Sequence, residues 1–135
     1  MVVVDANIIA ALVLEQEHSD EARQVWEMDP DWCAPPLWAS ELRSILAKYV
    51  KAGLLPARHA GPTMAVARRV VLPERTLESG DDEVLALAAK SGCSTYDCEY
   101  IAVAQELRLP LVTLNKQVLK AFPDIAVRPK DLLGS

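Results

Sequence analysis

The sequence predicts an α/β fold, a three-layer α/β/α sandwich around a central, mainly parallel sheet. Short β-branched or apolar runs, typical of strands covered on both faces, alternate with longer amphipathic segments. Such alternation is typical of parallel strands joined by crossover helices. The chain has 135 residues, of which 51% are hydrophobic, enough to build one core without disulfide or metal support. We therefore expect one domain over residues 1–135.

The N-terminal half is expected to contain two strands and four helices. Strands are predicted at 1–5 and 31–36, and helices at 7–15, 18–29, 37–55 and 56–70. Ser19 is a suitable N-cap for the second helix. The helix at 37–55 has the clearest apolar face, and Gly53 is well suited to end it. Gly61 and Pro62 predict a break in the helix that follows.

The C-terminal half continues the same alternation. The segment at 70–78 is either a weak strand or a connector, helices are predicted at 80–92, 97–109 and 115–122, and strands at 110–114 and 125–129. The helix at 80–92 has acids in its first turn and Lys90 and Gly92 at its end, as the helix dipole favours. Asp97 and Asn115 stand at the expected starts of the two later helices.

The apolar runs and the cysteines of the sequence indicate the cellular compartment. The longest apolar run, at 8–14, is too short to cross a bilayer, and the N-terminus opens directly into a strand pattern without the features of a signal peptide. Cys33, Cys93 and Cys98 are an odd number with no Cys-x-x-Cys spacing. We expect reduced, mostly buried thiols in a cytoplasmic protein and no zinc site.

The net charge of −5 argues mildly against nucleic-acid binding through a cationic surface. It does not exclude such binding, because acids that hold a divalent ion form a phosphate site in which the ion reverses the local charge.

Four polar residues stand where a parallel sheet would bring them together. Asp5 ends the first strand, Asp97 and Asn115 open helices, and Glu41 lies near the start of the helix at 37–55. The ends of parallel strands and the helix starts that follow them lie at one edge of a sheet. Converging carboxylates repel one another unless a cation is present, and oxygen ligands select a hard ion, Mg²⁺ or Mn²⁺.

Each of these residues also has a simpler structural interpretation. Asp97 and Asn115 could be ordinary helix N-caps, and Glu41 could be an exposed first-turn acid favoured by the helix dipole. Asp5 is harder to explain in this way, because an acid directly after a Val-rich central strand would be buried and would need a partner.

Basic residues near these acids have two interpretations. Arg43, Lys48 and Lys51 share the helix of Glu41, where a solvated face is the simpler explanation, and Arg43 should point elsewhere. Lys116 and Lys120 lie one turn apart beyond Asn115. This pair could contact phosphates or could compensate the helix dipole.

The tryptophans and histidines are expected to have structural roles. Trp26, Trp32 and Trp38 flank the first helices and are expected mainly in the core, although Trp38 could instead line a groove for a partner. His18 and His59 are expected at the surface.

Several segments of the chain resemble PIN-domain ribonucleases. They are "VVVDANII", "ASEL", "STYDCEYIAVAQELRLPLVTLNKQVL" and "AFPDIAV", in this order and at these spacings. Within that family the sequence is similar to VapC-type toxins of type II toxin–antitoxin pairs. The resemblance implies a PIN-like sandwich, usually a homodimer, and Mg²⁺- or Mn²⁺-dependent endoribonuclease activity. It also implies a cognate antitoxin whose C-terminal segment lies across the active-site groove.

Carried over by position, the resemblance assigns catalytic and metal-binding roles. Asp5 and Asp97 match acids that bind the metal directly, and Glu41 matches one that acts through water or orients the nucleophile. Asn115 stands where the family has a fourth acid, and it could still offer an uncharged oxygen to the metal.

Two further residues match supporting positions. Asn7 lies beside the first acid, and Thr113 matches the usual hydroxyl residue of a Thr-x-Asp motif that here reads Thr-Leu-Asn. Both are expected to orient the ligands. Lys116 and Lys120 are the candidate RNA-binding residues.

Three alternatives stay open from the sequence. A catalytically impaired PIN domain that binds RNA or antitoxin is favoured by Asn115. A phosphoaspartate enzyme built on Asp5 is disfavoured because Asn7 stands where such enzymes have a second acid. A nuclease that acts on duplex DNA shares the acid cluster, but this chain is short for the additional helices that grip a duplex.

Overall fold

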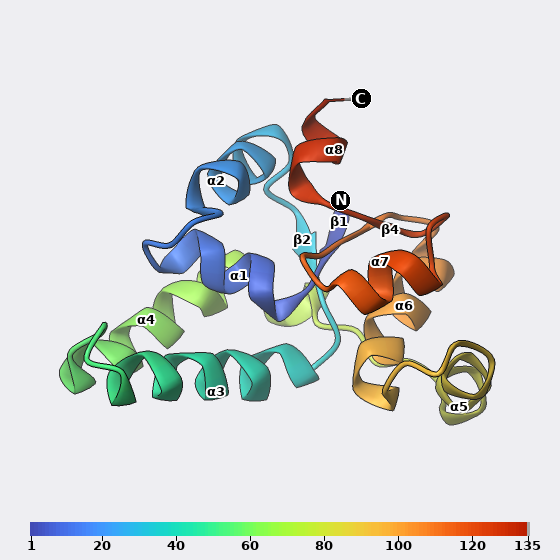
Figure 1. Cartoon of the computed structure of the whole chain (residues 1–135), viewed down its shortest axis with the longest axis horizontal. Helices are drawn as coiled ribbons and strands as arrows, with labels where there is room; N and C mark the ends of the chain where they lie inside the picture. The colour runs from blue at the N-terminus through green and yellow to red at the C-terminus, as the bar shows by residue number, and fades with distance from the viewer. Residues whose placement is uncertain (135) are drawn as a thin grey trace.

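A four-stranded parallel sheet with the order β2-β1-β3-β4 forms the centre of the molecule. The structure is a computed structural model that describes residues 1–134. The strands are β1 (Val2–Val4), β2 (Trp32–Cys33), β3 (Leu111–Val112) and β4 (Ala126–Val127). Helices flank this sheet, so the predicted α/β fold with a parallel sheet is confirmed (Figure 1).

The register of the sheet makes β1 its central strand. Val3 pairs with Cys33 of β2 on one side and with Leu111 of β3 on the other. All three valines of β1 are buried, because helices cover both faces of a central parallel strand. β1 and β3 therefore end side by side at one edge of the sheet.

Eight α-helices and one short 3₁₀ turn complete residues 1–134. They are α1 (Ala6–Val13), α2 (Ser19–Met28), α3 (Leu37–Lys51), α4 (Ala57–Val70), the 3₁₀ turn η1 (Pro73–Arg75), α5 (Asp81–Ser91), α6 (Thr95–Leu107), α7 (Lys116–Ala121) and α8 (Pro129–Leu133). α1 packs against α2, α3 and α4, whereas α6 packs against α5, β1 and β3. In Figure 1, α3 and α4 extend to the lower left, and α5 lies at the lower right.

The predicted helix break at Gly61 and Pro62 is wrong, because α4 runs through both residues. Both residues are exposed and lie near the start of the helix. Ala67 and Val70, further along α4, are buried against the core and hold the helix in place. Packing of this apolar face therefore outweighs the backbone hydrogen bond that Pro62 cannot donate.

Two predicted helix starts also differ in the structure. Ser19 is the first residue of α2 and not its cap; its buried hydroxyl donates to the Leu14 carbonyl at 2.7 Å and so links α1 to α2. α6 begins at Thr95 with Ser94 as its cap, so Asp97 lies inside the first turn. The capping interpretation of Asp97 is therefore wrong, and the Asp97 carboxylate is left available for another role.

The connector at 70–78 forms η1 and one isolated parallel bridge, between Ala34 and Thr76, rather than a full strand. α8 follows β4 and was not predicted, although Pro129 at its first turn is a recognised start signal. The expected ends at Gly53 and Gly92 are confirmed, since both adopt the left-handed conformation that glycine tolerates best.

The prediction that the tryptophans lie in the core is confirmed for two of the three. Trp32 and Trp38 are buried, whereas Trp26 is half-buried and packs edge-on against Trp32 with ring centroids 5.4 Å apart. The Arg68 guanidinium lies over the Trp38 ring. The three cysteines are free and buried. No helix within residues 1–134 has the length and hydrophobicity needed to cross a membrane.

Gly61→Ala is expected to raise the free energy of unfolding by about 1 kcal/mol, because Gly is a poor helix former and the added Cβ would meet no atom within 4 Å. Gly53→Ala is the matched control. Its added Cβ also meets open space, but the φ of 76° at Gly53 should make this variant less stable than the wild type. Urea denaturation measures both, and equal effects of the two substitutions would contradict this account of α4.

Candidate functional site

Asp5 stands where β1 ends and α1 begins, and its carboxylate is almost fully hydrogen-bonded. Oδ1 accepts from the backbone N–H of Ala6 at 2.7 Å, which caps α1. Oδ2 accepts from the Thr113 hydroxyl at 2.7 Å and from the Asn7 amide at 3.4 Å. Only 8% of Asp5 is exposed. The partners that a buried acid requires are therefore uncharged donors.

Asn7 and Thr113 connect the ends of the two central strands. The Leu114 N–H donates to the Asn7 side-chain oxygen at 3.3 Å, and the Asn115 N–H donates to the Thr113 hydroxyl oxygen at 3.0 Å. The loop after β3 is thereby fixed against the start of α1. This arrangement supports Asp5 from both sides, and it is consistent with the orienting role predicted for Asn7 and Thr113.

Asn115 is the N-cap of α7, as its capping interpretation predicts. Its side-chain oxygen accepts from the backbone N–H groups of Gln117 at 3.0 Å and Val118 at 3.2 Å. The same side chain lines the cavity with Asp97 and lowers the pKa of the Asp97 carboxyl. Because the oxygen of an amide can only accept, the amide nitrogen of Asn115 is the group that acts on the Asp97 carboxylate.

Asp97 is half-buried in the first turn of α6. Its backbone N–H donates to the Ser94 hydroxyl oxygen at 3.0 Å. Burial raises the pKa of the Asp97 carboxyl, and hydrogen bonds from the Ser94 and Asn115 side chains partly offset that rise. Asp97 lines the same cavity as Asn115, which follows β3.

Glu41 reaches the same region from α3. Its Oε1 accepts a hydrogen bond of 2.6 Å from the Tyr100 hydroxyl on α6. Burial raises the pKa of Glu41, the Tyr100 hydrogen bond lowers it, and the charges of Asp97 and Glu99 raise it further. Glu41 is therefore not the free first-turn acid of the simpler interpretation.

These side chains line a single cavity of about 260 Å³. Its lining brings together the predicted site residues Asp5, Asn7, Glu41, Asp97 and Asn115 with Ala6, Ser44, Ile45 and Lys48. A larger groove of about 760 Å³ runs between α1, α3 and α4, but its lining contains a single carboxylate, Glu15. The acid chemistry of the molecule is concentrated in the smaller cavity.

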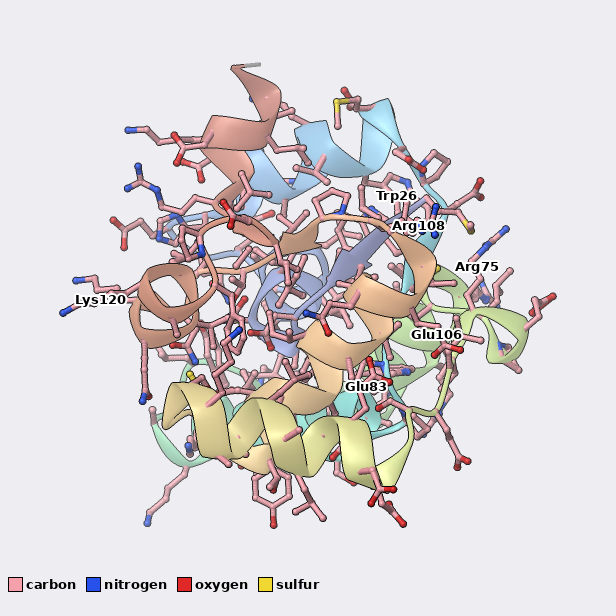
Figure 2. The ribbon with its side chains drawn as sticks, turned by 90° about the vertical axis from the view of Figure 1, so that its right-hand side faces the viewer. Trp26, Arg75, Glu83, Glu106, Arg108 and Lys120 are labelled. Atoms are coloured by element: carbon pink, nitrogen blue, oxygen red, sulfur yellow. The ribbon has the colours of Figure 1, made fainter. Side chains whose placement is uncertain are left out.

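The basic residue in the cavity differs from those favoured by the sequence. Lys48 lines it, whereas Lys116 and Lys120 do not. In Figure 2, Lys120 extends away from the body of the molecule. Lys48 follows Glu41 by two helical turns, which puts the two on one face of α3. This spacing is the sequence feature that could have predicted Lys48 as a site residue. The sequence contains no comparable feature that predicts the contact of Tyr100 with Glu41.

The electrostatics of the cavity favour bound positive charge. Burial is the largest effect on Asp5 and, together with the charges of Glu41 and Asp97, raises its pKa to about 6. No ion pair within residues 1–134 involves any of these three acids.

Within the described chain, no three His, Cys, Asp or Glu side chains form a group already set to hold a metal ion. The donors that line the cavity are nevertheless oxygens, which suits a hard divalent cation.

Comparison with known proteins identifies the family. The family model described as the PIN domain matches residues 2–125. The chain belongs to the PIN-domain family. Ribonuclease VapC3 from Pyrobaculum aerophilum is 30% identical to this PIN domain over 123 residues, which cover 90% of the chain and 94% of that relative. The similarity of the sequence to VapC-type members of the family is thus confirmed.

Two solved structures share the architecture of this PIN domain. The crystal structure of PAE2754 from Pyrobaculum aerophilum superposes with a TM-score of 0.75 at 26% identity, covering 98% of this chain and 92% of that one. A toxin–antitoxin complex from Klebsiella pneumoniae gives a TM-score of 0.69 at 22% identity, covering 96% and 98% of the two chains, and shows a common fold.

Without divalent ions, the free energy of unfolding should fall as the pH rises from about 4 to about 6 because of Asp5. Its pKa of about 6 in the folded chain exceeds the ordinary value of 3.8, so the folded state holds the proton more tightly. The stability gained from that proton is present below pH 4 and is lost as the pH rises through 6, a change on the order of 3 kcal/mol.

Urea unfolding at pH 4 and pH 7 in the presence of EDTA measures this dependence. Asp5→Asn should flatten it and should be more stable than the wild type at pH 7. An unchanged pH dependence in Asp5→Asn would show that Asp5 is not the group responsible.

Proposed function

We propose that this PIN domain is a metal-dependent endoribonuclease, the toxin of a type II toxin–antitoxin pair, and that it hydrolyses RNA phosphodiester bonds. The observation that carries the proposal is the convergence of Asp5, Glu41 and Asp97 on one cavity, where none of the three forms an ion pair within residues 1–134. The similarity to Ribonuclease VapC3 supports it.

Mg²⁺ or Mn²⁺ is the cofactor that fits these donors. Asp5 and Asp97 would hold the ion directly, and Glu41 would contact it through water. When bound, such an ion lowers the pKa of a coordinated water and offsets the negative charge of the phosphate. The residues of the chain bring these groups into place, since the carboxylates come from three different elements that meet at one edge of the sheet.

Glu41 is suited to take the proton from the attacking water. Its Oε1 is held by Tyr100, which leaves Oε2 directed to other partners. Burial and the neighbouring charges of Asp97 and Glu99 raise the pKa of Glu41, which makes its carboxylate a better base near neutral pH.

Asn115 distinguishes this site from one with four acids. Its oxygen accepts two backbone hydrogen bonds, and its amide lowers the pKa of the neighbouring Asp97 carboxyl. We infer that the three acids hold one tightly bound ion and that Asn115 supports Asp97, with activity weakened relative to a four-acid site. The role of Asn115 as an oxygen ligand stays a prediction that the substitution below tests.

Lys48 is the basic residue best placed for the scissile phosphate, because it lines the cavity with the acids. Lys116 and Lys120, beyond Asn115 on α7, would contact phosphates further along the RNA backbone. Together these residues would offset the repulsion between an acidic chain and a polyanion.

The proposed partners are a cognate antitoxin and a second copy of the chain. An antitoxin segment that carries a basic side chain over the cavity would neutralise its acids in place of the metal and so block the site. The homodimer is proposed from the family resemblance. The molar mass of the protein in solution tests it.

A catalytically impaired PIN domain is the second candidate, and Asn115 is the feature that favours it. Such a protein would bind RNA or antitoxin without Mn²⁺-dependent loss of a structured RNA substrate. The two substitutions described below separate these candidates.

Asp5→Asn is expected to abolish Mn²⁺-dependent RNA cleavage, by at least about a hundredfold, and to abolish growth arrest on expression, because the metal loses a charged ligand. Asp124→Asn, an exposed acid outside the cavity, is the matched control and should behave like the wild type. Cleavage is followed on a structured RNA in gels. Full activity in Asp5→Asn would exclude the proposed site.

Asn115→Asp is expected to increase Mn²⁺-dependent cleavage several-fold, because it restores a charged ligand while an aspartate can still cap α7. In EDTA the same variant should be less stable, since Asp97 would face a carboxylate instead of an amide donor. Asn115→Ser keeps a capping oxygen without the charge and should show no gain. If Asn115→Asp cleaves no faster than the wild type, the amide does not limit activity.

A further inference from the structure

We propose that Tyr100 is a positioning residue whose hydroxyl holds the Glu41 carboxylate in the cavity. The proposal deepens the proposed function, because it rests on Glu41 being part of the ion site. The observation behind it is the hydrogen bond of 2.6 Å from the Tyr100 hydroxyl to Oε1 of Glu41, between residues 59 positions apart in the chain.

The ring of Tyr100 is a rigid anchor. Tyr100 is 1% exposed and belongs to the hydrophobic core. It lies on α6 three residues after Asp97, so both side chains occupy the same face of that helix. Because α6 packs against β1 and β3, the position of the hydroxyl is set by the sheet. One helix therefore supplies a proposed metal ligand and the donor that holds another acid.

Glu41 needs such an anchor. It is half-buried on α3, which packs against α1 and α4, and its side chain has several rotatable bonds. The charges of Asp97 and Glu99 act against its ionised form. Without a donor, the Glu41 carboxylate would be more stable turned toward water, and the cavity would lose one of its acids.

The direction of the hydrogen bond follows from the chemistry of the two groups. An ionised carboxylate can only accept, so the Tyr100 O–H donates. Burial and the charges of Asp5 and Glu41 raise the pKa of Tyr100, so the phenol keeps its proton. The hydroxyl thereby links α6, which carries Asp97, to Glu41 on α3.

The test is a double-mutant cycle between Tyr100 and Glu41, read as the Mn²⁺ dissociation constant by calorimetry. Tyr100→Phe removes only the hydroxyl and should weaken Mn²⁺ binding about tenfold. Tyr49→Phe is the matched control: the Tyr49 hydroxyl accepts from Gln16 at 3.2 Å in the larger groove, and its loss should leave Mn²⁺ binding unchanged. In a Glu41→Ala background, Tyr100→Phe should have no further effect.

Two results would overturn the proposal: wild-type Mn²⁺ affinity in Tyr100→Phe, or an equal loss with and without Glu41. Glu41→Asp tests the same hydrogen bond by changing the acceptor instead of the donor. It replaces Tyr100→Phe as the test if that variant does not fold. Its shorter side chain cannot reach the hydroxyl, so Mn²⁺ binding should weaken by a similar factor, and unchanged affinity would contradict the proposal.

The RNA assay adds an independent measurement. If the wild type cleaves RNA, Tyr100→Phe should lower kcat with little change in KM, because the substrate contacts stay in place. A wild type that binds Mn²⁺ through Glu41 but cleaves no RNA would refute the proposed function while leaving the role of Tyr100 intact.

Discussion

Mutual repulsion among one buried and two half-buried carboxylates is the constraint on which the rest of this site depends. Asp5, Glu41 and Asp97 line one cavity, and burial raises the pKa of each. In the described chain none of them forms an ion pair with Lys, Arg or His. An arrangement that costs the protein stability in this way is expected where a cation is to be bound.

Uncharged donors hold the acids in place without neutralising them. Thr113 donates to Asp5 and Tyr100 donates to Glu41, and the Asn115 side chain lowers the pKa of the Asp97 carboxyl. Lysine or arginine partners would stabilise the carboxylates more strongly, but they would compete with a metal ion for the same oxygens. Hydroxyl and amide donors fix the orientation of the carboxylates and leave their charge available, which is the usual division of labour around metal ligands.

The parts of the fold that depend on periodicity and strand composition could be predicted from the sequence. The valines of β1 and the regular alternation of elements indicate a parallel sheet, and that arrangement brings Asp5 and Asn115 to one edge. Asp97 follows α5 rather than a strand, and it joins them because α6 packs against β1 and β3. The contact between Glu41 and Tyr100 could not be predicted, because it joins residues 59 positions apart and depends on where the fold places α3 relative to α6. The course of α4 through Pro62 likewise depends on packing against the core, which local sequence does not encode.

The central claim is that the cavity binds one divalent ion through its acids. Calorimetric titration of the metal-free protein with Mn²⁺ at pH 7.5, for the wild type and for Asp97→Asn, tests it most directly. The account predicts about one tightly bound ion per chain in the wild type and a large loss of affinity in the variant. Absence of binding to the wild type, or equal binding to both proteins, would contradict it.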